Sequence, residues 1–407
     1  MENKKLKVGN VPPLRFPGFE GEWKSKKLGE IATFSKGKGI SKSDIEENGL
    51  TECIRYGELY TYYGEVINDI KSKTNVDTSN LVLSEVNDVI IPASGETTID
   101  IATASCVLKS GIALGGDLNI IKTENNGVFL SYYLNNKKKM EIANLAQGIS
   151  VVHLYSSQLA TLTLNFPKLE EQNRISTFLA LFDARIQTQN KIIEELKLLK
   201  NTLSKKLFSG QLKFKDEFGN NFPEWESKEL SEVMSVPEKI KSRNIDKSRL
   251  LTVKLHLKGV SQNDNTNTLS LGATNYFIRK KGQFIYGKQN LFNGAFGIIP
   301  DEFDGFLSSG DVPALDINHS KINTAYLLYF LGRADFYKRL EDLATGSGSK
   351  RIHETTLLGV KIDFPTIEEQ YKIANFLLSI DGKIEIETNI LQKLERQKTY
   401  FLANLFI

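Results

Sequence analysis

The sequence predicts an α+β fold: two mixed α/β bodies joined by two long antiparallel coiled-coil helices, with an internal pseudo-two-fold duplication. Two observations lead to this prediction. The pattern Phe-Pro-x-x-Glu-Glu-Gln occurs twice, 198 residues apart, at 166–172 and 364–370. Each copy is followed by apolar residues spaced alternately four and three apart, which is the period of a coiled-coil seam. A repeat this long is not a solenoid unit, so the pattern indicates duplication of a whole domain.

A second pair of matching segments begins the two halves. Glu22-Trp23 and Glu224-Trp225 lie 202 residues apart, and a Phe-Pro pair precedes each of them. The middles of the two halves do not match, and the segment 36–41 has no evident counterpart. We therefore expect an N-terminal arm and first body at 1–165, a first long helix at 166–210, a linker and second body at 211–363, and a second long helix at 364–407.

The two long helices follow from their seams. We expect the seams to contain, in the first helix, Ile175, Leu179, Phe182, Ile186, Ile193 and Leu196, then Leu203 and Leu207, and in the second, Ile373, Leu377, Ile380, Ile384, Leu391 and Leu394, then Phe401 and Leu405. A Pro before each helix suits a strand-to-helix boundary, and Gly210 is expected to end the first. About 36 residues at ~1.5 Å each would give a rod about 50 Å long. On pattern alone the rod is either a structural hairpin or a partner-binding element.

The bodies are predicted to mix strands and helices. Segments 88–91, 117–121, 282–286 and 311–315 have the short apolar pattern of strands, and 129–145 and 325–331 have that of helices. Each body ends in a Gly-containing loop, at 147–150 and 345–351, and a short strand then leads into the Phe-Pro pair.

The composition is that of a globular protein without a strong charge. There are 52 Lys and Arg against 49 Asp and Glu, a net charge of +3. This excludes a histone-like binder but not local basic patches. Two cysteines, Cys53 and Cys106, cannot build a disulfide framework. The first residues are not an apolar leader, and no segment is long and apolar enough to span a membrane, so we expect a cytoplasmic protein.

The search for catalytic chemistry is negative. The Gly/Lys-rich segments at 37–39 and 346–350 lack the spacing of a P-loop, and the four histidines are scattered without metal-ligand spacing. The Asn-Pro-Pro-aromatic pattern of amino-methyltransferases is absent from the sequence. These observations favour a binding protein without catalytic or metal-ligating residues.

Basic residues near glycines are the candidate binding groups, since small residues let a backbone approach a phosphate, and Asn, Gln and Arg can read base edges. The candidates are Lys36, Lys38, Lys42, Arg55, Lys288, Gln289, Asn290, Lys350 and Arg351. A further cluster is Arg279-Lys280-Lys281. Each cluster taken alone is also compatible with ordinary solvated surface.

Together these features resemble the DNA-specificity (S) subunit of type I restriction–modification enzymes. The resemblance rests on the duplication, the two Pro-x-x-Glu-Glu-Gln-x-x-Ile motifs from Pro167 and Pro365, and the segment 37–60. It implies that each body is a target-recognition domain for one half of a split double-stranded DNA site, and that the helices act as a ruler.

The resemblance also implies partners: two methyltransferase (M) subunits with S-adenosylmethionine, and restriction (R) subunits with ATP and Mg. No cofactor is expected in this chain. We expect an asymmetric site because the bodies differ, and we expect deletions of two or four residues around 198–207 to shorten the unread spacer or abolish recognition. With its near-neutral charge, the chain alone should bind DNA weakly. Two rivals remain open: an interaction scaffold that does not touch DNA, and an enzyme whose motifs were missed.

Overall fold

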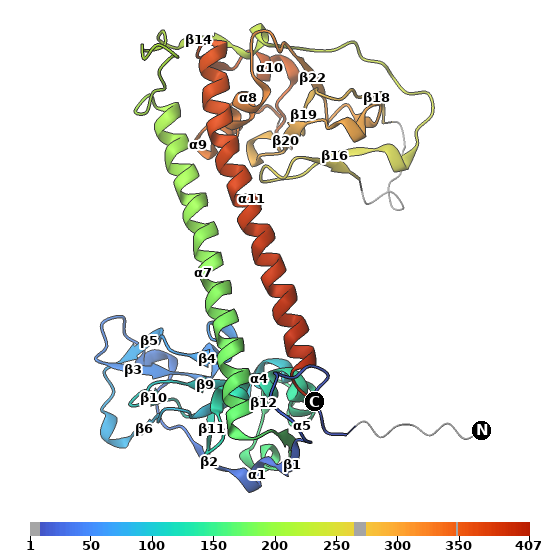
Figure 1. The fold of residues 1–407 in the computed structure, drawn as a ribbon. Coiled ribbons are helices and arrows are strands. Elements are labelled where there is room, and N and C mark those ends of the chain that lie inside the picture. Colours follow the sequence, from blue (N-terminus) through green and yellow to red (C-terminus); the bar gives the residue numbers. More distant parts are fainter. Residues whose placement is uncertain (1–8, 264–273, 347–348) are drawn as a thin grey trace, which may run out of the picture. The chain divides into compact units, whose positions relative to one another are not determined.

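The computed structural model describes residues 9–263, 274–346 and 349–407 (Figure 1). The N-terminal residues that argued against a leader, and Ser347-Gly348 of the second Gly-containing loop, lie outside this range. The chain forms two compact units. Unit 1 consists of Met1–Lys191 and Thr388–Ile407, and unit 2 of Ile192–Glu387. Each unit therefore takes one segment from each long helix.

Unit 1 contains two sheets. The five-stranded sheet has the order β2-β11-β7-β9-β4, and the four-stranded sheet has the order β5-β3-β10-β6. Their bounds are β2 (Ala32–Lys36), β11 (Leu118–Thr123), β7 (Val89–Pro92), β9 (Ser105–Val107), β4 (Val66–Ile67), β5 (Ser72–Thr74), β3 (Thr51–Ile54), β10 (Ala113–Leu114) and β6 (Val82–Leu83). β3 and β10 are parallel, whereas β10 and β6 are antiparallel.

Unit 2 repeats much of this strand order. One sheet has the order β15-β22-β19-β20, and the pairs β16-β17 and β18-β21 correspond to the other sheet. A parallel bridge between Leu250 and Leu307 links those pairs at the place where β3 pairs with β10 in unit 1. The bounds are β15 (Met234–Ser235), β22 (Ala314–Ile317), β19 (Phe284–Tyr286), β20 (Phe296–Ile298), β16 (Leu251–Val253), β17 (Val260–Gln262), β18 (Tyr276–Ile278) and β21 (Leu307–Ser309).

Some of the remaining elements also match between the two units. A two-stranded ladder closes each body, β1 (Lys24–Lys27) with β13 (Thr163–Phe166) and β14 (Glu226–Glu229) with β23 (Lys361–Phe364). In unit 1, β8 (Ser94–Gly95) pairs with β12 (Val152–His153). The short helices are α1 (Leu28–Ile31), α2 (Tyr56–Thr61), α3 (Thr98–Ile101), α4 (Gly127–Tyr133), α5 (Lys139–Leu145), α6 (Ser156–Leu159), α8 (Thr324–Leu331), α9 (Ala334–Tyr337) and α10 (Glu354–Leu358). A π-helical turn, Leu134–Lys138, joins α4 to α5 within the segment predicted as one helix.

The two long helices are α7 (Leu169–Phe208) and α11 (Ile367–Asn404). α7 ends just before Gly210, whose φ of 72° is the left-handed conformation typical of a residue beyond a helix C-terminus. Among the described residues, no helix is long and apolar enough to cross a membrane. The predicted fold class, two mixed α/β domains with long antiparallel helices and internal duplication, is confirmed.

The helix ends are buried in the bodies. In unit 1, Ile175 and Leu179 of α7 share the main core with Leu405 and Phe406 at the end of the chain. In unit 2, the main core contains both Leu207 of α7 and the first apolar residues of α11. All the residues expected in the two seams are buried or half-buried. The bodies therefore bury the two ends of the apolar stripe that the sequence assigned to helix pairing.

The repeated Glu-Glu-Gln motif fastens each long helix to its body through the glutamine. Gln172 accepts a hydrogen bond from the backbone N–H of Asn126, the residue before α4, at 3.0 Å, and donates to the carbonyl of Pro167 at 3.0 Å. Gln370 makes the same two contacts, with the N–H of Asn323 before α8 at 2.8 Å and with the carbonyl of Pro365 at 3.0 Å. A buried amide that satisfies both backbone groups explains why this residue type recurs.

The second glutamate of the motif is used differently in the two units. Glu369 accepts a hydrogen bond from the indole Nε1 of Trp225 at 2.9 Å. In unit 1 the corresponding Glu171 instead accepts two 2.7 Å hydrogen bonds from Arg15. The buried Nε1 of Trp23 has no hydrogen-bond partner among the described residues. In unit 1, Arg15 of the N-terminal arm thus bonds to the glutamate that the tryptophan contacts in unit 2.

In each unit an ion pair crosses between the helices, and the two pairs occupy positions related by the repeat. Asp183 lies 2.6 Å from Lys398, and Lys200 lies 2.6 Å from Asp381. Asp183 and Asp381 are 198 residues apart, and so are Lys200 and Lys398, so the two pairs are equivalent under the repeat. In unit 1 Tyr132 also donates to Asp183, as Tyr329 does to Asp381 at 2.5 Å in unit 2. The antiparallel register is therefore fixed by the same chemistry in both units.

We expect Asp183→Ala to destabilise unit 1 by about 2 kcal/mol, because it leaves Lys398 and the Tyr132 hydroxyl without this acceptor. The chain has two tryptophans, one in each unit. Denaturant unfolding followed by Trp23 fluorescence in a Trp225→Phe background measures unit 1 separately. Exposed Glu194 on α7 provides the control Glu194→Ala. A loss no larger than that of the control would contradict this assignment.

Candidate nucleic-acid interface

Each unit has an open cavity beside the connection between its two sheets. In unit 1 the cavity measures about 540 Å³ and in unit 2 about 320 Å³. The first is lined by Gly39, Ile40, Ser41, Lys42, Asp44, Arg55, Tyr56, Gly57, Gly115, Gly116 and Asp117. The second is lined by Val236, Pro237, Lys239, Thr274, Asn275, Phe277, Arg279, Lys288, Ser309, Gly310, Asp311, Pro313, Ala314 and Glu354.

The two cavities occupy matching places in the repeat. Residues 115–117 connect β10 to β11, and 309–311 lie at the equivalent connection from β21 to β22. The segments that follow the matching strands β2 and β15 line the other side of each cavity. The fold thus provides one site twice, with different side chains around it.

Only some of the predicted site residues of unit 1 line its cavity. Lys42 and Arg55 line the cavity, whereas Lys36, at the end of β2, and Lys38 are exposed but do not line it. A glycine is required at position 37 for a structural reason, since a Cβ there would lie 2.0 Å from the carbonyl oxygen of Gly115. Its small size therefore lets two protein backbones approach each other.

The guanidinium of Arg55 is hydrogen-bonded to a buried carboxylate. Glu58, 2% exposed, accepts from the Arg55 guanidinium at 3.1 Å and from the Ser72 hydroxyl at 2.5 Å. The Nε of Arg55 is buried and has no hydrogen-bond partner among the described residues. The guanidinium is therefore fixed in position but not fully satisfied.

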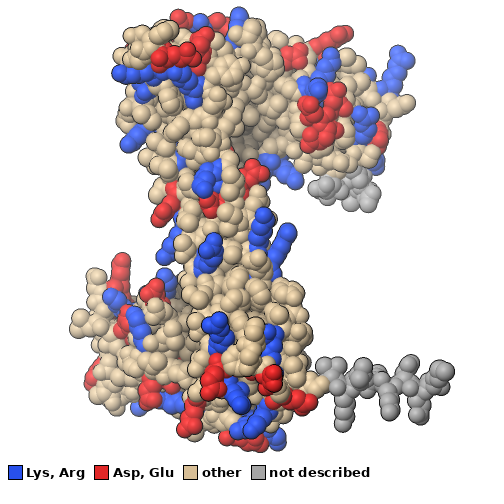
Figure 2. All heavy atoms as spheres, in the orientation of Figure 1, with Lys and Arg blue, Asp and Glu red and all other residues tan. Residues whose placement is uncertain are grey.

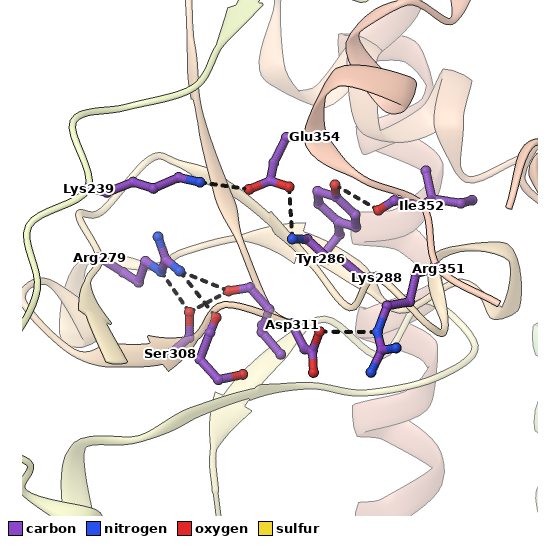
Figure 3. A network of polar contacts seen from close by, with 11 residues as sticks. Lys239, Arg279, Tyr286, Lys288, Ser308, Asp311, Arg351, Ile352 and Glu354 are labelled. Atoms are coloured by element: carbon purple, nitrogen blue, oxygen red, sulfur yellow. Dashed lines mark hydrogen bonds and ion pairs between the residues drawn. The ribbon is translucent and has the colours of Figure 1, made fainter. Parts of the chain in front are cut away.

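In unit 2 the three cations among the predicted site residues are all paired with carboxylates, and Figure 3 shows the pairs of Lys288 and Arg351. Lys288 lines the cavity and lies 2.9 Å from Glu354, and Arg351 lies 3.3 Å from Asp311. Lys350, outside the cavity lining, is paired with Glu341 at 2.8 Å. Gln289 and Asn290 follow Lys288, half-buried and exposed respectively. The role of these residues in DNA contact stays a prediction.

Four further charged residues line this cavity, Lys239, Arg279, Asp311 and Glu354, and none was among the predicted site residues. Lys239 lies 3.2 Å from the second oxygen of Glu354, so that carboxylate bridges two lysines. Arg279 stood in a basic cluster in the sequence, but the structure buries it while Lys280 and Lys281 remain exposed. No sequence signal marked Lys239 and Glu354, because they are isolated charges that meet only through the fold.

The charges in the cavity have shifted pKa values. Burial would raise the pKa of Glu354, but the hydrogen bonds and positive charges of Lys288 and Lys239 lower it to about 2. Burial lowers the pKa of Arg279 to about 10, so it stays protonated at neutral pH. On the face shown in Figure 2, basic and acidic side chains of the described residues are interspersed over both units.

The pKa of Glu354 predicts acid lability of unit 2. A carboxyl whose pKa is depressed by folding contributes stability above its ordinary pKa of 4.5, and loses it as the pH falls toward 2. A shift of this size corresponds to roughly 3 kcal/mol at neutral pH. We expect unfolding of unit 2, followed by Trp225 in a Trp23→Phe background, to become much less pH-dependent between pH 5 and 2 in Glu354→Gln. Equal pH dependence in both proteins would contradict the assignment.

Known proteins match this chain over nearly its full length. Residues 20–198 and 223–396 match the family described as the type I restriction modification DNA specificity domain. The type I restriction enzyme MjaVIII specificity subunit of Methanocaldococcus jannaschii is 26% identical, over 93% of this chain and 90% of its own. The putative MjaX specificity subunit of the same organism is also 26% identical, over 70% of this chain and 69% of its own.

Solved structures show the same fold. The S subunit of a type I restriction–modification system from M. genitalium has a TM-score of 0.62 at 17% identity, covering 98% of this chain and 99% of its own. A chain from a structure on complex assembly of the type I R-M system has a TM-score of 0.52 at 16% identity, covering 96% of this chain and 98% of its own. The resemblance found in the sequence is confirmed, and the chain belongs to the type I restriction modification DNA specificity family, as a specificity subunit and not a catalytic one.

Proposed function

We propose that the chain recognises an asymmetric, bipartite double-stranded DNA site, and that each unit reads one half. The observation that carries this proposal is the pair of cavities, which lie at equivalent connections of a shared topology but have different linings. A duplicated scaffold with identical linings would favour a palindrome. Different linings favour two unrelated half-sites.

We also propose that the chain docks two methyltransferase (M) subunits and, through the assembly, restriction (R) subunits. S-adenosylmethionine would be held by the M subunits, and ATP and Mg by the R subunits. Support comes from the family membership and from the related chain whose structure concerns assembly of a type I system. The modest charge of the chain also fits this proposal, since the partners would supply much of the phosphate neutralisation.

The long helices would set the distance between the half-sites. α7 and α11 are unbroken over 40 and 38 residues, and each unit contains a segment of both. A helix of 40 residues spans about 60 Å, comparable to about 18 base pairs along B-DNA. This length is sufficient for a split site with unread base pairs between its halves.

One prediction of this proposal concerns the symmetry of the recognised DNA site. We expect sequencing of methylated bases, in cells that express the chain with its methyltransferase subunit, to return a split motif with two unrelated halves. Gel retardation of the co-purified complex should then require both halves. A palindromic motif would contradict the asymmetry, and a complex that binds no DNA would favour the scaffold alternative.

Another prediction of this proposal concerns the unread base pairs between the two half-sites. Deleting Gln189–Glu195 from α7 and Glu387–Lys393 from α11 removes one heptad from each helix and keeps the phase of both seams. Because this shortens each helix by about 10 Å, we expect the unread spacer to lose about three base pairs while both half-sites keep their bases. Replacing the same heptads with others of equal length is the control. An unchanged spacer in a folded, methylating deletion variant would refute the ruler.

A further inference from the structure

The cavity of unit 2 has more charge than its fold requires. Three cations line it, Lys239, Arg279 and Lys288, together with two acids, Asp311 and Glu354. Both lysines are bound to Glu354, and Asp311 is paired with Arg351. Arg279 is therefore the cavity cation that has no carboxylate in contact with it among the described residues (Figure 3).

Arg279 is held rigidly by neutral acceptors. The residue is 4% exposed, and its Nε donates to the Ser308 hydroxyl at 2.6 Å. Its Nη2 donates to the carbonyls of Ser309 at 3.4 Å and Val312 at 3.2 Å. Its Nη1 has no acceptor among the described residues, and in Figure 3 one guanidinium nitrogen is directed away from these contacts. A preorganised guanidinium with spare donors suits a hydrogen-bond acceptor supplied from outside.

Unit 1 serves as an internal control, because backbone hydrogen bonds identify the equivalent positions. The N–H of Ser84 donates to Ile112, just before β10, and the N–H of Arg279 donates to Phe306, just before β21, both at 2.8 Å. Ser84 is therefore the counterpart of Arg279.

The other two positions are found in the same way. Ala93 donates to the carbonyl of Asp117 at 2.8 Å, and Lys288 to that of Asp311 at 2.9 Å. The residues two positions before Ser156 and Glu354, Leu154 and Ile352, donate to the carbonyls of Ala93 and Lys288 respectively. Unit 1 thus places Ser84, Ala93 and Ser156 where unit 2 places Arg279, Lys288 and Glu354.

This substitution of small side chains for charged ones shows that the shared topology forms without the charged set. Burying an arginine and a Lys–Glu pair costs desolvation energy, so a fold that does not need them has no stability reason to contain them. Charges retained in a cavity under these conditions indicate a ligand. Glu354, bound to both lysines, positions the wall of the cavity, whereas Arg279 keeps the donor capacity.

We propose that the unit 2 cavity takes a hydrogen-bond acceptor of DNA, with Arg279 as the donor and the Lys239–Glu354–Lys288 network as its positioning frame. The acceptor is either a backbone phosphate oxygen or the O6/N7 edge of a guanine, since a guanidinium recognises both. This inference rests on the proposed DNA recognition and adds the contact group of one unit.

The test compares Arg279→Gln with Lys280→Ala in the complex co-purified with its methyltransferase subunit. Lys280 is the adjacent, exposed cation outside the cavity. The probes are duplexes carrying the motif of the wild-type complex, and the readouts are Kd at several salt concentrations and the methylated motif. We expect Arg279→Gln to weaken binding at least tenfold relative to the control.

The two sources of the acceptor give different results. A phosphate contact lowers the slope of log K against log salt by about one and leaves the motif unchanged. A guanine contact relaxes one position in the half-site of unit 2 and leaves the other half-site intact. Binding within twofold of Lys280→Ala, with slope and motif unchanged, would overturn the proposal.

A folding control keeps the test decisive. Trp225 fluorescence in a Trp23→Phe background shows whether unit 2 of each variant is folded. If Arg279→Gln does not fold, Arg279→Lys keeps the charge but removes the planar fork, and the same readouts and the same overturning outcome apply. The double variant Lys288→Ala/Glu354→Ser installs the residues of unit 1 and should weaken binding through loss of the frame. Absence of DNA binding by the wild-type complex would instead refute the proposed function.

Discussion

The end of the chain completes the core of its first half, and much of the architecture depends on this contact. Phe406 is fully buried, with its ring centroid 5.2 Å from that of Phe129 and 5.6 Å from that of Tyr133. Phe208, its counterpart at the repeat offset, lies 5.7 Å from Tyr326 and 5.5 Å from Phe330. A phenylalanine at the end of α7, and another two residues beyond the end of α11, are thus buried against the aromatic side chains of the bodies, and each is called a plug below. The plug of unit 1 comes from the second helix, and that of unit 2 from the first.

Because each plug lies at or just beyond the end of a helix that begins in the other unit, both helices are structural parts of both units. A body that ended at its Phe-Pro pair would lack the buried aromatic contacts that the plug supplies, each pair contributing about 1 kcal/mol beyond its buried area. The Asp–Lys pair of each unit then fixes the register between α7 and α11, and with it the position at which each plug packs into its core. Because α7 and α11 each begin in one unit and end in the other, their lengths are coupled to the packing of both bodies.

The sequence revealed those features that depend on local pattern. The seam period, the Pro before each helix and Gly210 after the first allowed the long helices to be predicted. The duplication predicted a shared scaffold for the two bodies but not the order of their strands, because that order resides in backbone pairing, which strands of two to six residues with unrelated side chains can maintain. The cavity of unit 2 was missed for a related reason. Glu354 follows β19 by 68 residues and meets Lys239 and Lys288 only after the chain has folded.

The pairing of surface cations bears on how a nearly neutral subunit can recognise DNA. Lys288, Lys350 and Arg351 each lie within 3.3 Å of a carboxylate, so their charge attracts a distant polyanion only weakly. A cation that is held by neutral acceptors, as Arg279 is, keeps its donor capacity for a ligand at short range. Short-range donors favour the correct partner over other DNA of equal charge, whereas unpaired surface lysines would strengthen binding to both. A low net charge is therefore consistent with the proposed function, in which this subunit contributes discrimination and the proposed partners supply the bulk attraction to phosphate.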